Sequence, residues 1–382
     1  MLKIWISTTM ILMFIISSCV NGQNDQTVNE PADIKDGKLY LDLIEMPEGF
    51  HIETYATGLE DARSMAMGPR GNIFVGNRTE DKVYLLRDTN SDFKADERHV
   101  IAEGLNMPNG VAYYQGDLYV AEVNRILRFP DIMEHYNQEP SFEVIYDNYP
   151  TDRHHGWKYI DFGPDGKLYV PVGAPCNICE SEQPIYATIT RMDPDGSNLE
   201  IYAEGIRNTV GFTWHPETEE LWFTDNGRDR MGDNIPPDEL NKAPAKGLHF
   251  GYPYCHGNDI SDPKLGKGKS CQDYIKPEQE LGPHVAALGV IFYTGDMFPK
   301  SYKNQILIAE HGSWNRSEKI GYRLMKAGME NGEVQSYQPF AKGWLQGEQV
   351  WGRPVDILQL HDGSLLVSDD YGDAIYRITY RK

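Results

Sequence analysis

The 382-residue sequence predicts an all-β fold, and specifically a six-bladed β-propeller. Three observations lead to this prediction: a short turn-and-strand phrase recurs six times, apolar residues alternate beside its copies, and the composition favours short strands joined by turns. The chain holds 36 Gly, 23 Pro and 11% aromatic residues. Gly and Pro mark turns, and aromatic side chains suit a pleated surface.

The recurring phrase is a turn containing Gly or Asp, followed by three residues that favour strands. Its six copies carry the triplets IFV at 73–75, LYV at 118–120, LYV at 168–170, LWF at 221–223, ILI at 306–308 and LLV at 365–367. Most copies are spaced by about 45–60 residues, which suits one four-stranded blade plus a loop. The longest interval, before the fifth copy, predicts an insertion at about 228–283.

Strands with alternating apolar residues flank most copies, for example at 82–86 and 374–378. Alternation with period two predicts half-buried antiparallel strands. A single blade cannot bury both of its faces, so blades packed around an axis are the natural solution. A β-sandwich is the structural alternative, but six copies of one unit favour the propeller.

The chain is acidic, with a formal net charge of -21. Such a chain repels phosphate backbones, which excludes nucleic acid as an expected partner. The excess of carboxylates serves solubility, and clusters of them could also hold a divalent cation.

The first residues predict export. Lys3 precedes an apolar run at 4–16 that is short for a membrane span and fits a signal peptide. The run ends in Ile-Ser-Ser-Cys19, which resembles a bacterial lipobox, so we expect a lipoprotein signal at 1–18 and a lipid anchor at Cys19. A plain secretory peptide is the alternative. The polar stretch 19–40 predicts a flexible tether, and 41–382 the propeller domain at the cell envelope.

Four cysteines remain beyond Cys19. Outside the cytoplasm an even set indicates disulfides, and Cys176 with Cys179 and Cys255 with Cys271 are the natural pairs. A four-cysteine zinc site is the alternative.

Polar residues on the loops between blades are the candidates for chemistry, because propeller sites open onto the axis. His154 and His155 lie just before the third triplet. A histidine near the axis can take a proton from a hydroxyl group at neutral pH. A surface histidine pair without a role is the alternative.

Two further turns surround the fourth triplet. Arg207 and Asn208 in GIRN offer donors that fit carboxylates, although an arginine can also simply close a blade turn. Asn226, Gly227 and Arg228 in TDNGRD provide oxygens, including backbone carbonyls, that suit Ca²⁺.

A last set lies beside the fifth and sixth triplets. Arg316 in EHGSWNR and Arg353 in WGRPVD add cationic groups next to aromatic planes. Several arginines, a histidine, a cation and stacking aromatics together suit a planar polyanion.

Together these segments resemble the PQQ-dependent glucose/sorbosone dehydrogenase family, which includes the soluble aldose sugar dehydrogenases. The resemblance covers about 45–380, and it rests on the histidine turn before GPDGKLYV, on GIRN, on FTDNGRD with PPDELN, and on GRPVDILQLHDGSLLVSDDYGDAIYRI. It implies a six-bladed propeller with PQQ on the axis, Ca²⁺ beside it, and a sugar or a sugar-derived aldehyde or alcohol as substrate.

The resemblance also implies roles for single residues. His155 would be the general base that takes the hydroxyl proton as hydride leaves for the quinone, with His154 as the second choice. The residues implied to contact PQQ are Arg207, Asn208, Asn226, Arg353 and, in the place of a family lysine, Arg316 or Lys319. The carbonyls of Gly227 and Arg228 would bind Ca²⁺.

The sequence departs from the family at Trp157 and Lys158, where related enzymes carry an arginine. Because the chain lacks a haem motif, we expect a separate protein or a quinone as external electron acceptor. Two other functions stay open: a Ca²⁺-dependent lactonase or esterase, which would need a ring of Asp, Glu and Asn side chains, and a non-catalytic surface propeller.

Overall fold

The computed structural model describes residues 33–382. The expected signal peptide 1–18, the anchor Cys19 and the tether up to residue 32 lie outside the described residues. Among residues 33–382, no helix combines the length and apolar composition needed to cross a membrane.

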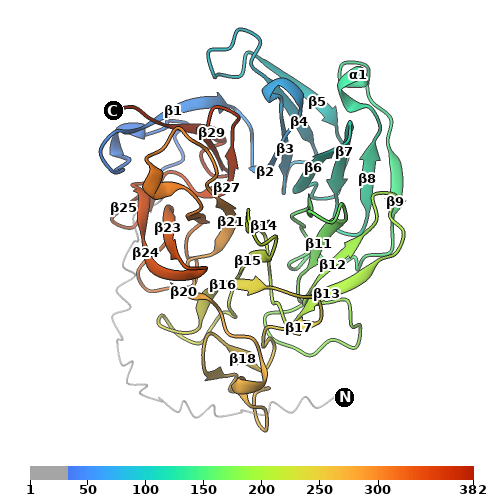
Figure 1. Cartoon of the computed structure of the whole chain (residues 1–382), viewed down its shortest axis with the longest axis vertical. Coiled ribbons are helices and arrows are strands. Elements are labelled where there is room, and N and C mark those ends of the chain that lie inside the picture. Colours follow the sequence, from blue (N-terminus) through green and yellow to red (C-terminus); the bar gives the residue numbers. More distant parts are fainter. Residues whose placement is uncertain (1–32) are drawn as a thin grey trace, which may run out of the picture. The chain divides into compact units, whose positions relative to one another are not determined.

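Six antiparallel four-stranded blades surround a central axis, which confirms the predicted propeller (Figure 1). Each predicted triplet lies in the second strand of its blade. The first two blades contain β2 (Ala62–Met67), β3 (Ile73–Asn77), β4 (Val83–Arg87) and β5 (Glu97–Ala102), then β6 (Gly110–Tyr114), β7 (Asp117–Ala121), β8 (Ile126–Phe129) and β9 (Glu143–Tyr146). The third contains β10 (Asp161–Phe162), β11 (Leu168–Val172), β12 (Thr188–Met192) and β13 (Glu200–Glu204).

The fourth blade contains β14 (Phe212–Trp214), β15 (Leu221–Asp225), β16 (Pro237–Ala243) and β20 (Gln279–Pro283). The fifth contains β21 (Ala287–Phe292), β22 (Ile306–Glu310), β23 (Arg323–Glu330) and β24 (Glu333–Lys342). The sixth contains β27 (Pro354–Gln359), β28 (Leu365–Asp369), β29 (Ala374–Tyr380) and β1 (Phe50–Thr57). Helical segments are short: α1 (Ile132–His135), η1 (Leu41–Leu43), η2 (Pro69–Gly71), η3 (Cys271–Asp273) and η4 (Lys300–Tyr302).

The ring closes by pairing its two chain ends. Strand β1 runs antiparallel to β29 and forms the outer edge of the sixth blade, so one sheet holds both ends of the domain (Figure 1). The Phe50 ring, 8% exposed, packs edge-on against the rings of Phe298 and Phe340 with centroids 4.7 and 5.0 Å away. This aromatic cluster fastens the closing strand to the fifth blade.

The second strand of each blade is buried more completely than the alternating pattern predicted. The second strands β3, β7, β11, β15, β22 and β28 are buried at every position, and β29 is buried at six of its seven positions. The cause is that each blade is covered on both faces by its neighbours. Half-buried strands are found at the outer edge, as in β5.

The insertion is narrower than the expected 228–283, because β16 and β20 at its ends are strands of the fourth blade. The additional segment is 244–278. It contains β17 (Leu248–His249), which adds to the third blade in parallel, and the small hairpin of β18 (Cys255–His256) and β19 (Ile260–Ser261). Both expected disulfides, Cys176–Cys179 and Cys255–Cys271, are present, which confirms the disulfide interpretation over the zinc site.

The end of the expected tether is packed rather than flexible. The backbone N–H of Ile34 donates to the Val350 carbonyl at 2.8 Å, and the Asp33 carboxylate accepts from the Val350 N–H at 3.1 Å. Tyr40 lies edge-on to Trp351, 5.9 Å between ring centroids. Residues 33–40 therefore cover the hairpin of β25 (Leu345–Gln346) and β26 (Gln349–Val350), and this part of the tether prediction is corrected.

Candidate active site

The blade topology brings the loops of different blades to one mouth. In each blade the first strand starts, and the second strand ends, at the same end of the axis, because the two strands are antiparallel. Residues just before first strands and just after second strands therefore gather there. His155, Arg207 and Arg353 precede first strands, whereas Asn226 and His311 follow second strands.

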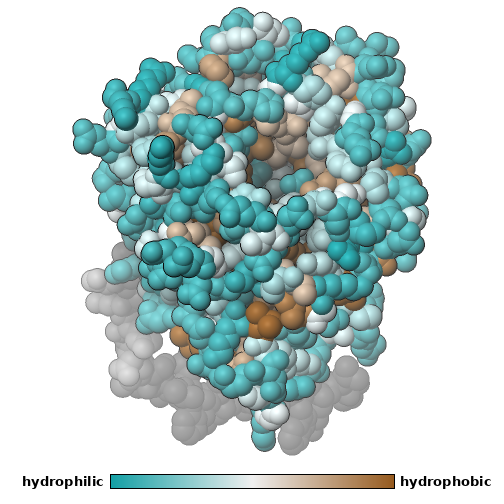
Figure 2. All heavy atoms as spheres, in the orientation of Figure 1, coloured by the Kyte–Doolittle hydropathy of each residue, from teal (hydrophilic) through white to brown (hydrophobic). Residues whose placement is uncertain are grey.

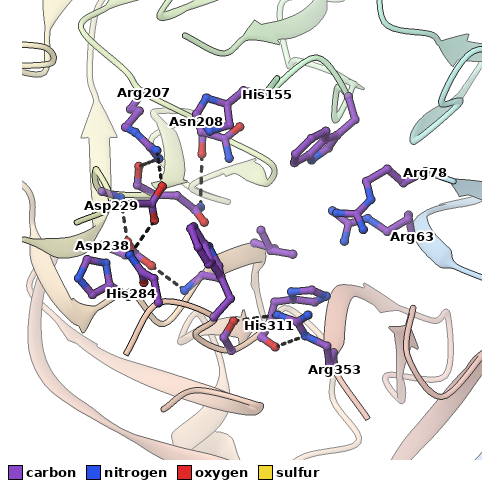
Figure 3. A pocket seen from close by; sticks show the side chains of 18 residues that line it. Arg63, Arg78, His155, Arg207, Asn208, Asp229, Asp238, His284, His311 and Arg353 are labelled. Atoms are coloured by element: carbon purple, nitrogen blue, oxygen red, sulfur yellow. Dashed lines mark hydrogen bonds and ion pairs between the residues drawn. The ribbon is translucent and has the colours of Figure 1, made fainter. Parts of the chain in front are cut away.

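These residues line a cavity of about 250 Å³ at the mouth (Figure 3). Figure 2 shows the central hollow within a mostly hydrophilic surface. The cavity is lined by six of the residues singled out from the sequence, namely His155, Arg207, Asn208, Asn226, Gly227 and Arg353. It also contains residues that the sequence did not point to, among them Arg63, Arg78 and His284.

His155 is held in one tautomer by a backbone contact. Its Nδ1 lies 2.9 Å from the carbonyl oxygen of Ala174, which can only accept, so Nδ1 carries the proton and Nε2 keeps a lone pair. Burial, together with the positive charge of Arg207, holds the pKa of His155 well below its usual value. Close packing requires Gly173, where a Cβ would lie 2.6 Å from the His155 Cβ. The ring is a neutral proton acceptor.

Arg207 is almost fully engaged by the protein. Its Nε and Nη2 donate to the carbonyl and side-chain oxygens of Asn177 at 2.9 and 3.0 Å, and Nη1 donates to the Asn226 carbonyl at 3.0 Å. Nη2 also pairs with Asp229 at 3.0 Å. Four of its five N–H groups are thus used within the chain, so Arg207 offers the cavity mainly its charge.

The two asparagines differ in what they present. The Asn208 side-chain amide forms no hydrogen bond within the part of the chain that the structure describes, while its backbone N–H donates to Asp225 at 2.6 Å. The amide nitrogen of Asn226 donates to the carbonyls of Ala287 and Asn208 at 2.7 and 3.3 Å. Asn208 is therefore the freer donor and acceptor.

The Gly227–Arg228 turn presents backbone oxygens. The Gly227 N–H donates to Asp238 at 2.8 Å, and the Arg228 side chain turns to Asp262 instead of the cavity. Within residues 33–382, the carbonyls of Gly227 and Arg228 accept no hydrogen bond. Among the described residues, no group of three or more His, Cys, Asp or Glu side chains is arranged to hold a metal ion.

Arg353, Arg63 and His311 form a connected group around one buried carboxylate. Arg353 donates to the carbonyls of His311 and Gly312 at 3.1 and 2.9 Å. Asp370 accepts from Arg63 at 2.8 Å and from His311 Nε2 at 2.7 Å. Burial opposes the charge on Asp370, but His311 and Arg63 outweigh it and keep its pKa well below the usual value. Burial and Arg353 lower the pKa of His311 to about 3.

Arg78 lies beside Trp157, one of the two positions at which the sequence departs from the family. Its guanidinium lies over the Trp157 ring, 5.2 Å from the centroid, and has no hydrogen-bonded or ionic partner among the described residues. Burial and the nearby Arg63 lower its pKa. The Trp157 Nε1–H and the Asn315 side-chain oxygen are also buried without a partner. The sequence carried no signal for Arg78, because it follows β3 without a motif.

Besides Arg228 and Lys319, two further expected site residues lie outside the cavity lining. His154 is exposed, with its ring centroid 4.0 Å from that of His155. Arg316 donates to the carbonyls of Glu318, at 3.1 Å, and Asp233. Neither side chain belongs to the residues that line the cavity.

Positive charge dominates the lining. Four arginines face two aspartates, of which Asp229 is paired with Arg207. Burial raises the pKa of Asp238 to about 7, although its backbone hydrogen bonds oppose this. The chain as a whole carries -21, so the cavity is a cationic hollow in an acidic protein, suited to an anion.

The fold and the site together define this chain as a six-bladed β-propeller with a cationic axial cavity and a neutral histidine in its wall. The chain belongs to the family described as a domain of unknown function, DUF7133, whose model matches residues 38–378. An uncharacterized protein of Borreliella burgdorferi is 33% identical over 356 residues, covering 89% of this chain and 91% of that protein.

Two named proteins are also similar. The aldose sugar dehydrogenase YliI of Escherichia coli is 32% identical over 108 residues, covering 28% of this chain and 27% of that protein. The holo form of the pyranose dehydrogenase PQQ domain from Coprinopsis cinerea superposes with a TM-score of 0.75 at 16% identity, covering 88% of this chain and 97% of that one. The resemblance predicted from the sequence is thereby confirmed, and this superposition establishes the fold.

Proposed function

We propose that this chain is an oxidoreductase that oxidises a sugar, or a sugar-derived aldehyde or alcohol, with PQQ as cofactor and Ca²⁺ beside it. The observation that carries the proposal is the cationic axial cavity with a neutral, tautomer-fixed histidine in its wall. The partial identity to an aldose sugar dehydrogenase and the fold shared with a pyranose dehydrogenase PQQ domain support it.

The residues present fit a planar polyanion such as PQQ. Arg78 has an unpartnered guanidinium, Trp157 Nε1–H lacks an acceptor, and the Asn208 amide is free of the protein. These groups, with the charges of Arg63 and Arg353, would hold carboxylates and ring oxygens. When bound, PQQ would supply a quinone that accepts the two electrons removed from the substrate.

The unpartnered carbonyls of Gly227 and Arg228 would hold Ca²⁺, a hard cation that prefers oxygen ligands. The Asp238 carboxylate fixes this turn through the Gly227 N–H at 2.8 Å and ties it to the start of the fifth blade through the Ala286 N–H at 2.7 Å. The turn is thus held in place from two neighbouring loops.

The chain's own part in the chemistry is proton transfer and positioning. His155 Nε2 would accept the substrate hydroxyl proton, while Nδ1–H stays on the Ala174 carbonyl and keeps the ring oriented. Because burial and Arg207 disfavour the imidazolium, the base is unprotonated at neutral pH. Trp314, 67% exposed at the rim, offers an aromatic face to a sugar.

The two alternative functions receive less support. A lactonase or esterase site would need a ring of acidic and amide side chains, whereas the described lining is dominated by arginines. A purely binding propeller would not need a buried histidine fixed in its basic tautomer. Export, a lipid anchor at Cys19 and a separate electron acceptor remain part of the proposal.

Reconstitution tests the proposed function. The purified domain is incubated with PQQ and Ca²⁺, binding is measured by calorimetry, and reduction of an artificial dye is followed with a panel of aldoses and polyols. We expect PQQ binding and turnover with at least one sugar. Failure of PQQ to bind, together with no turnover across the panel, would overturn the proposal.

A further inference from the structure

We propose that Asn177 is a positioning residue, and that the small disulfide ring Cys176–Cys179 holds it against Arg207 and Asp229 at the wall of the cavity. The ring lies on the loop between β11 and β12, and only three positions separate its two cysteines. The consequence for catalysis rests on the proposed function, whereas the orientation of Arg207 does not.

Asn177 contacts its two charged neighbours through every polar group that it can offer except its own N–H. Its carbonyl accepts from Arg207 Nε at 2.9 Å, and its side-chain oxygen accepts from Arg207 Nη2 at 3.0 Å. The same oxygen accepts from the Asp229 N–H at 2.8 Å, and its side-chain nitrogen donates to the Asp229 carbonyl at 3.0 Å. One residue from the third blade thus clamps two residues of the fourth.

The loop that carries the ring also touches the candidate base. Ala174 donates its N–H to the Arg207 carbonyl at 2.8 Å and accepts from His155 Nδ1 at 2.9 Å. On its other side the ring is fastened to the insertion, where the buried Tyr252 hydroxyl accepts from the Cys179 N–H at 3.2 Å. The loop is held from three directions and fixes both His155 and Arg207.

The Cys176–Cys179 disulfide restricts the conformations of the loop that carries Asn177. A loop that must present one asparagine in a single orientation loses conformational freedom, and a covalent ring removes most of that freedom in advance. Arg207 is 4% exposed on its side chain, so a misplaced partner would leave buried N–H groups without acceptors. The ring therefore acts on the cavity through Asn177.

The first measurement does not involve a cofactor. Selective ¹⁵N-arginine labelling follows hydrogen exchange at the Nη2–H groups of Arg207, one of which donates to the Asn177 side-chain oxygen; the signal is assigned by its absence in Arg207→Lys. We compare the wild type, Asn177→Ala, Asn177→Asp, and Cys176→Ser with Cys179→Ser. The matched control is Cys255→Ser with Cys271→Ser, which opens the other disulfide.

We expect exchange at Arg207 to accelerate about tenfold or more in Asn177→Ala and in the ring-opened variant, because bonds to a charged group are lost. Asn177→Asp keeps the oxygen acceptor and should restore most of the protection. Combining Asn177→Ala with the two cysteine substitutions of the ring should accelerate exchange at Arg207 little beyond either change alone, because both act through the same contact. The control variant should leave Arg207 unchanged.

The second measurement is PQQ affinity by calorimetry. Losing a residue that orients a binding group costs about 10–100-fold in comparable sites, so Asn177→Ala should weaken PQQ binding by that factor and Asn177→Asp by less. Unchanged Arg207 exchange in Asn177→Ala, or equal effects of the two disulfide variants, would overturn the inference. If the wild type binds no PQQ and turns over no sugar of the panel, the proposed function fails, and the exchange experiment still decides the role of Asn177. If the ring-opened variant does not fold, Asn177→Ala against Asn177→Asp decides it.

Discussion

Substitutions of His155 can separate its proposed role as general base from its structural role as a hydrogen-bond donor to the Ala174 carbonyl. Its φ of +52° lies in the left-handed region, which asparagine tolerates better than other residues with a side chain. Asparagine can also donate to the Ala174 carbonyl, but its amide is no base. His155→Asn should therefore keep the hydrogen bond to the Ala174 carbonyl and lose the proton acceptor. His155→Ala loses both the hydrogen bond and the proton acceptor.

The structure sets the expected magnitudes. Removing a positioned general base costs about 10²–10⁴-fold in rate, so both variants should lose this much in kcat. His155→Ala also leaves the buried Ala174 carbonyl without its donor, at a cost of about 1–3 kcal/mol in the free energy of unfolding.

The assay combines dye reduction by the PQQ- and Ca²⁺-loaded domain with urea unfolding of the same variants. His154→Ala is the matched control, because its ring is a neighbour in sequence and space yet lies outside the cavity lining. We also expect the acidic limb of kcat/KM to lie below pH 6.5, since the pKa of His155 is lowered. Full activity of His155→Asn with bound PQQ would refute the assignment, and loss confined to His154→Ala would move the base there.

Three further predictions concern binding, pH and closure. Arg78→Gln should weaken PQQ binding about tenfold or more by calorimetry, because a charge-assisted bond is lost, whereas Arg316→Gln, outside the lining, should not change it. Burial raises the pKa of Asp238 from 3.8 to about 7 and that of Glu239 from 4.5 to about 8, so the folded chain binds these protons more tightly than the unfolded chain. Their contribution to stability is fully present below the unfolded-state pKa values and is lost as the pH rises from there through the folded-state values of about 7 and 8, so the calorimetric Tm should fall over that whole range and level off above it. Phe50→Ala should lower the free energy of unfolding by about 3–5 kcal/mol in urea titrations, since it removes a buried ring from the closing cluster; a loss under 1 kcal/mol would contradict its role there.

The sequence predicted the blades well because they repeat locally. Each triplet, such as those centred on Phe74 and Tyr119, follows a turn within a few residues. A local turn followed by strand-forming residues suffices to identify a strand. The closing pair of β1 with β29 was not foreseen, because strand pairing between the two ends of a domain leaves no local pattern. The extent of the insertion was overestimated for the same reason, since β20 pairs with β16 across more than thirty residues of chain.

The candidate site divides in the same way. The sequence alone determined which loops would carry it, because the residues before first strands and after second strands must meet at one end of a propeller. Only the tertiary structure decided which side chains reach the cavity: it brought in Arg63 and Arg78, left Arg316 outside, and turned Arg207 towards Asn177 and Asp229. The reason is physical. Most strands pair with their neighbours in sequence, so local patterns identify them, whereas the direction of a loop side chain depends on partners from other blades.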